Sequence, residues 1–185
     1  MSLKNLTKLG LAVLVVSTFS YSMTLAEATC NGTITLATAD EEIGPGQTCG
    51  GDYTNTNASD DSDQCFEETL SGSVSKLYQV WEFEDVPPGD QYLIFEGHRA
   101  PNADGDNFKF SASWVDGGGV HFLLFPGAVI NTNFEPVGGL KVSMGKTTTA
   151  TYEWYVYLKD TAGGSNNDTV YVDYLAICTE EPVGD

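Results

Sequence analysis

The stretch FKFSASWVDGGGVHFLLF, residues 108–125, decides the fold class. From Phe108 to Trp114, apolar side chains alternate with polar or small ones, which is the period of a β-strand with one buried face. Three glycines at 117–119 then mark a turn, and a second β-favouring run follows at 120–125. The stretch therefore predicts two strands joined by a tight turn.

Short runs of this kind recur along the chain between clusters of Gly, Pro, Asn and Asp. After residue 28, no 11-residue window keeps the 3.6-residue period of a helix. Many short strands with Gly/Pro-rich turns predict an all-β fold, an antiparallel β-sandwich of the jelly-roll type with about eight or nine strands. A closed barrel is the alternative. Trp81 and Trp114, each in register with phenylalanines, are expected in the core.

Residues 1–28 have the features of a secretory signal peptide. Lys4 and Lys8 form a basic start, and the apolar run at 9–19 is short for a membrane span. Ala26-Glu27-Ala28 matches the small-x-small pattern of a cleavage site. We expect a secreted (extracellular or periplasmic) protein with no membrane insertion after cleavage; an uncleaved anchor helix is the alternative.

The rest of the chain is expected to form one domain, residues 29–178, followed by a short acidic tail, 179–185. Without residues 1–28, the chain has 6 basic and 25 acidic residues, a formal charge of −19. Such a surface repels phosphate backbones, which excludes nucleic acid as a partner. It suits cations or cationic surfaces, and it also fits an exported or salt-adapted protein that is simply highly soluble.

Four cysteines lie in the exported part of the chain: Cys30, Cys49, Cys65 and Cys178. An even number in an oxidising compartment favours two disulfides over a metal site or a reactive thiol. Three pairings are possible from sequence. We favour Cys49–Cys65, which closes a polar loop, and Cys30–Cys178, which joins the two ends of the domain.

Two segments resemble a β-sandwich accessory module of bacterial secreted proteins, commonly appended to extracellular hydrolases and peptidases. They are SKLYQVWEFEDVPPGDQYLIFEGHRAPNADGDNFKFSAS (75–113) and NNDTVYVDYLAI (166–177). More distantly, the layout is similar to jelly-roll carbohydrate-binding modules of the galactose-binding-like type. The resemblance covers roughly residues 52–178 and implies a structural calcium near the end of the sandwich, by the last strand.

A polar loop could hold that calcium. Its side chains at alternate positions around a glycine can converge on one ion, and calcium prefers six to eight oxygen ligands. The predicted ligands are Asn102, Asp104 and Asp106, with Asp168 and Asp173 as more distant ones. The alternative is an Asx-turn without metal. A second acidic run, residues 60–63, is more typical of a solvated loop.

Aromatic residues suggest a binding surface. The alternation in residues 152–159 places Tyr155 and Tyr157 on one face of a strand, and Tyr171 could join them from the last strand. Exposed rings stack on the apolar faces of sugars, so the predicted ligand is a polysaccharide or cell-surface glycan. Ordinary packing of tyrosines between strands is the alternative.

Enzyme motifs are missing from the sequence: there is no Gly-x-Ser-x-Gly and no His-Glu-x-x-His. Paired carboxylates are plentiful, but an acidic composition supplies them without catalysis. We therefore expect a non-catalytic binding module supported by calcium. The alternatives are an exported structural or adhesion protein acting through protein–protein contacts and, as a minor one, a hydrolase.

Overall fold

The computed structural model describes residues 29–72, 74–100, 108–123, 129–130, 139–160 and 167–182. In these residues the chain forms β-strands and one 3-10 helix, η1 (Tyr53–Thr56). No helix of this part of the chain has the length and apolar character needed to cross a membrane.

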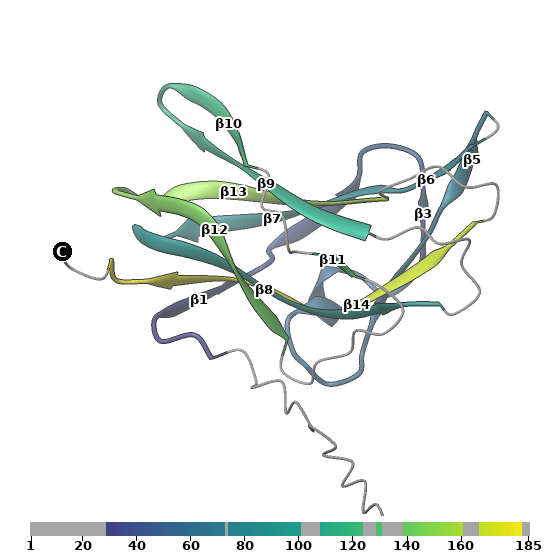
Figure 1. Cartoon of the computed structure of the whole chain (residues 1–185), viewed down its shortest axis with the longest axis horizontal. Coiled ribbons are helices and arrows are strands. Elements are labelled where there is room, and N and C mark those ends of the chain that lie inside the picture. The colour runs from purple at the N-terminus through teal and green to yellow at the C-terminus, as the bar shows by residue number, and fades with distance from the viewer. Residues whose placement is uncertain are drawn as a thin grey trace, which may run out of the picture.

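Two six-stranded sheets lie face to face (Figure 1). Sheet A has the order β12 (Leu140–Thr148), β8 (Gly89–Arg99), β14 (Thr169–Glu180), β4 (Gln64–Glu67) and β3 (Gln47–Gly50), and β1 (Thr33–Leu36) also pairs with β14. Sheet B has the order β10 (Gly119–Leu123), β9 (Phe108–Asp116), β13 (Tyr152–Asp160), β7 (Tyr78–Val86) and β2 (Ala39–Glu42), and β11 (Val129–Ile130) also pairs with β9. A separate hairpin joins β5 (Thr69–Ser71) and β6 (Val74–Lys76).

The antiparallel pairs are nested in the chain. β4 pairs with β14, β7 with β13, β8 with β12, and β9 with β10. This is the pairing of one long antiparallel ribbon, and rolling the ribbon up adds the contacts of β14 with β8 and of β13 with β9. The predicted jelly-roll sandwich is therefore confirmed. The eight strands of the ribbon lie in two separate sheets, so the barrel alternative is wrong. Short strands such as β1 and β2 add to these eight.

The core lies between the sheets and is rich in aromatic rings. Trp81 of sheet B is fully buried, and its ring makes an edge-to-face contact with Phe66 of sheet A, with ring centroids 5.3 Å apart. Phe95 and Phe110 meet across the layers at 4.8 Å. Burial of each such side chain stabilises the fold by about 2–3 kcal/mol. The predicted core position of Trp114 is also confirmed.

Both predicted disulfides are present. Cys30–Cys178 joins the segment before β1 to the last strand, and Cys49–Cys65 joins β3 to β4. Each bridge ends on a strand of sheet A, so both hold the first part of the chain against that sheet. The last strand itself runs to Glu180.

Candidate functional site

The outward face of sheet B carries a group of aromatic and polar side chains. In β13, Trp154 and the alternate residues after it are buried, so Tyr155 and Tyr157 point outward, as the alternation predicts. Tyr155 lies between Ser113 of β9 and Glu82 of β7. Pairing of distant strands thus places the predicted tyrosines between residues of two other strands.

Three rings on this face form a series that we name the aromatic row: Tyr78, Tyr157 and Phe122. The ring centroids of Tyr78 and Tyr157 are 5.8 Å apart, and those of Tyr157 and Phe122 are 6.3 Å apart. Neighbouring rings are tilted by 32° and 35°. Phe122 is 70% exposed, which is unusual for a phenylalanine. The Tyr157 hydroxyl is hydrogen-bonded to the Ser113 hydroxyl at 2.8 Å.

Sequence reasoning missed Tyr78 and Phe122. Tyr78 alternates with Val80 and Glu82 along one strand, so the sequence pattern already indicated that these three side chains share a face. What the sequence does not show is that β7, β13 and β10 belong to the same sheet. Only that arrangement turns separate rings into one surface.

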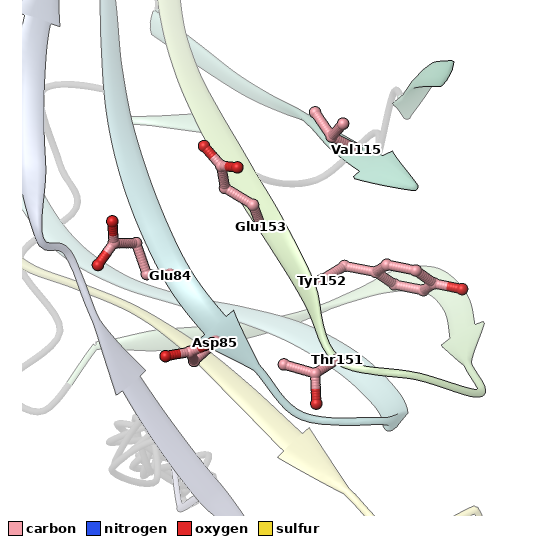
Figure 2. A pocket seen from close by; sticks show the side chains of 6 residues that line it. All are labelled: Glu84, Asp85, Val115, Thr151, Tyr152 and Glu153. Carbon is pink, nitrogen blue, oxygen red and sulfur yellow. The ribbon is translucent and has the colours of Figure 1, made fainter. Parts of the chain in front are cut away.

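Two cavities are lined by residues of β7 and β13. One, of about 220 Å³, is lined by residues of β2, β7 and β13: Ala39, Asp40, Glu41, Val80, Glu82 and Tyr155. The other, of about 460 Å³, lies at the end of sheet B. Figure 2 shows its lining residues Glu84, Asp85, Val115, Thr151, Tyr152 and Glu153, with the carboxylates of Glu84 and Glu153 on the neighbouring strands β7 and β13.

The carboxyl groups beside Tyr155 interact with one another. The Tyr155 hydroxyl donates a hydrogen bond to Glu153, which lowers the pKa of Glu153 and raises that of Tyr155. A hydrogen bond with Glu153 also raises the pKa of Glu82, together with burial and the charges of Glu153, Glu84 and Glu41. Glu82 and Glu153 therefore titrate as an interacting pair, in which the pKa of Glu82 is raised and that of Glu153 is lowered.

Tyr171 lies elsewhere. It belongs to β14 of sheet A, where its ring stacks on His98 at 4.6 Å with an interplanar angle of 13°. The structure does not bring Tyr171 to Tyr155 and Tyr157, because β14 is in the other layer of the sandwich.

The predicted metal ligands Asn102, Asp104 and Asp106 lie outside the described residues. Asp173 is buried at an irregularity of β14, and its carboxylate accepts the backbone N–H groups of Asp60 at 3.4 Å and Ser62 at 3.0 Å. Burial raises the pKa of Asp173. Its visible role is to hold the acidic loop 60–63 against sheet A.

Asp168 belongs to a different group, which we name the Glu68 cluster: Glu68, Asp168 and Arg99. The Asp168 carboxylate is 3.7 Å from the Arg99 guanidinium, and its backbone N–H donates to Glu68 Oε2 at 3.1 Å. Glu68 is fully buried, and its Oε1 has no hydrogen-bond partner. Burial raises the pKa of Glu68 to about 7. Thus Asp168 and Asp173 contact separate sets of residues.

Among the described residues, the one group of three candidate metal-binding side chains that lie close together is elsewhere: Cys30, Cys178 and Glu180. Its two sulfur atoms form a disulfide, so they are not available as thiolate ligands.

Comparison with known proteins gives distant structural matches. No family model matches the sequence, and no curated protein matches it. The chain is similar to TmCBM61, solved in complex with β-1,4-galactotriose (TM-score 0.43, 15% identity, 76% of this chain and 87% of that chain). It is also similar to the xylan-binding CBM22-1 domain of Paenibacillus barcinonensis Xyn10C (0.46, 10%, 83% and 99%). Both are carbohydrate-binding modules, the class of domain that the sequence resembles.

A third match is the enzymatically active domain of the bacteriophage CBA120 tailspike protein 4, with TM-score 0.40 and 13% identity; it covers 83% of this chain and 20% of that chain. All three TM-scores lie below 0.5. The fold assignment therefore rests on the strand pairing described above, and the function on the outward face of sheet B.

Proposed function

We propose that the chain is a secreted, non-catalytic binding module that holds a polysaccharide or surface glycan on the outward face of sheet B. The observation that carries the proposal is the aromatic row. Its rings are spaced 5.8 and 6.3 Å apart on one exposed face, where the apolar sides of consecutive sugar rings can stack on them. Hydroxyl groups of Ser111 and Tyr157 on the same face offer hydrogen bonds to sugar hydroxyls.

The tilt between the rings supports a particular kind of polymer. A flat crystalline surface requires coplanar rings, whereas neighbouring rings here are tilted by 32° and 35°. A single, twisted polysaccharide chain matches that arrangement better. The ligand we propose is therefore a soluble or amorphous chain rather than the face of a crystal.

A non-catalytic role is supported by the carboxyl pair on this face. Glycosidases separate their two carboxyl groups by about 5–5.5 Å or about 6.5–9.5 Å, so that a nucleophile or a water fits between them. Glu82 and Glu153 are instead hydrogen-bonded directly to each other. Two disulfides also fit the oxidising compartment of a secreted protein.

We also propose a structural calcium at the Glu68 cluster. The negative charges of Asp168 and Asp160 both act on the buried Glu68, and the Arg99 guanidinium lies 3.7 Å from the Asp168 carboxylate. The Glu68 oxygen without a donor is an available hard ligand, which fits a calcium ion. Bound calcium would balance the negative charge of these carboxylates, and it would link Glu68, after β4, to Asp168, before β14.

The last described residue before the predicted loop ligands lies next to this cluster. The backbone N–H of Ala100 donates to the carbonyl of Thr169 at 2.9 Å, so the segment that leads to Asn102, Asp104 and Asp106 starts beside Asp168. Asp173 does not fit the same ion, because its carboxylate holds the loop at residues 60–62.

The test is retention of the chain without its predicted signal peptide (residues 29–185) on insoluble polysaccharides, in calcium and in EDTA. Phe122→Ala and Tyr157→Ala should each weaken retention about tenfold, since one stacking contact contributes on the order of 1 kcal/mol. Leu70→Ala is the matched control, because Leu70 is 60% exposed but lies on the separate β5–β6 hairpin.

Competition with soluble oligosaccharide separates the two main functions. A glycan module is released from the polymer by its own oligomer, whereas an adhesion or structural protein that acts through protein contacts is not. Absence of retention on every polymer, or equal loss in the Leu70 variant, contradicts the glycan proposal.

A further inference from the structure

The outward face of sheet B is divided by charge. Lys159 and Lys109 are paired at one end, beside Tyr78, whose ring lies 4.3 Å from the Lys159 ammonium. At the other end, around Tyr155, the charged side chains are carboxylates. The two ends of the face therefore present opposite charges to a bound chain.

The smaller cavity lies at the acidic end and has the walls of a sugar site. Its volume of about 220 Å³ is of the order of one pyranose ring with its substituents. Tyr155 supplies an aromatic wall, and Val80 and Ala39 supply apolar ones. Glu82 and Glu41 are the acidic side chains of the same lining that belong to the outward face. Such a cavity combines ring stacking with negative charge.

The charges near Glu82 favour the binding of a cation there. The neighbouring charges that act on it are those of Glu153, Glu84 and Glu41, all of the same sign. Asp40 also lines the cavity, but its carboxylate accepts the side-chain amides of Gln64 at 2.6 Å and Gln79 at 3.2 Å.

We infer that the cavity beside Tyr155 takes the ammonium group of an amino sugar, so that the preferred ligand is a polysaccharide of hexosamine units with free, unacetylated amino groups. This inference rests on the proposed function. An ammonium placed against the Tyr155 ring gains a cation–π contact and charge-assisted hydrogen bonds to Glu82 and Glu41. Polymers of uronic acids or sulfated sugars would meet like charge there and are disfavoured.

Binding of the ammonium also affects the titration of Glu82. In the free protein, the hydrogen bond with Glu153 and the neighbouring negative charges raise the pKa of Glu82. An ammonium bound beside Glu82 supplies a positive charge and so lowers that pKa again. The groups involved are Glu82, Glu153 and Tyr155, with Glu84 and Glu41 as the neighbouring charges.

The experiment compares two oligosaccharides that differ only in charge: the β-1,4-linked glucosamine hexamer and its fully N-acetylated form. Binding of each is measured by calorimetry at about pH 6, where the sugar amine is charged. We expect the free-amine hexamer to bind about tenfold tighter or more, with a preference that falls as salt rises.

Two variants remove the same net charge at different places. In Glu82→Gln, the affinity for the free-amine hexamer should be only about one to three times the affinity for the acetylated hexamer. Glu181→Gln, at an exposed position beyond the end of β14, should leave the preference unchanged. Equal binding of the two hexamers, or equal loss of preference in both variants, overturns the inference.

The outcomes also distinguish the two proposals. If both hexamers bind equally well, or if only a neutral polymer such as a galactan or a xylan is retained, glycan binding stands and the ammonium site is refuted. If neither hexamer nor any polymer binds, the proposed function itself is refuted.

Discussion

Replacing Glu68 by glutamine tests the buried carboxyl at the end of the sandwich. Burial raises the pKa of Glu68 from an ordinary 4.5 to about 7. The folded protein therefore holds this proton more tightly than the unfolded chain does. The stability that comes with it is complete below about pH 4.5 and is lost as the pH rises through about 7. A difference of this size corresponds to about 3 kcal/mol of unfolding free energy.

Glu68→Gln keeps the shape of the side chain and still accepts the Asp168 N–H, but it cannot ionise. In calcium-free buffer with EDTA, we expect the variant to gain stability relative to wild type by about 3 kcal/mol between pH 4.5 and pH 8. The measurement is urea unfolding, followed by tryptophan fluorescence, at four pH values. Glu67→Gln, the half-exposed neighbour on β4, controls for removal of a charge from the same strand.

A stability difference that stays constant from pH 4.5 to pH 8 would refute the reasoning, since it would mean that the Glu68 carboxyl ionises in the folded protein at no cost. Repeating the series with excess calcium then tests the proposed metal site. Wild type should recover its stability at high pH, because the cation takes the place of the proton, whereas the glutamine variant should respond much less.

Three other changes follow from the fold. Removing the Cys30–Cys178 bridge, which spans 148 residues, should lower the free energy of unfolding by about 5 kcal/mol, against about 3 kcal/mol for Cys49–Cys65, which spans 16; urea unfolding of the two double-alanine variants checks the order, and equal losses contradict it. Trp81→Phe should cost about 3 kcal/mol, because it leaves a gap in the core and removes the indole N–H that donates to a buried glutamine oxygen at 2.9 Å. A loss below about 1 kcal/mol in the same assay would mean that the core closes around the gap. Asp173→Ala should speed amide exchange in the loop at 60–62, whose N–H groups it accepts; unchanged exchange rates would contradict that anchoring role.

Features that depend on neighbours in the chain could be predicted from the sequence. The alternation in residues 108–114 and 152–159 determines which side chains point into the core, because successive residues of a strand face opposite sides whatever the strand pairs with. The same local rule places Tyr155 and Tyr157 on one face. The two disulfides followed from the even number of cysteines and from the segments that each bridge would close.

Features that depend on which strands pair were decided by the tertiary structure. Tyr78 and Tyr157 are far apart in the chain, and they meet only because β7 pairs with β13. The same pairing places Glu82 against Tyr155, while β14 carries Tyr171 into the other sheet. The irregularity in β14 after Val172 changes the alternation locally, which the sequence pattern does not reveal.

The sequence by itself thus determined the class of the fold and the side of each strand that is buried, and it indicated two disulfides. The tertiary structure decided the aromatic row, the pairing of Glu82 with Glu153, and the separation of Asp168 from Asp173. The physical reason is that alternation is a property of a single strand, whereas a surface is made by long-range hydrogen-bonded pairing, and many pairings of the same strands would satisfy the same alternation.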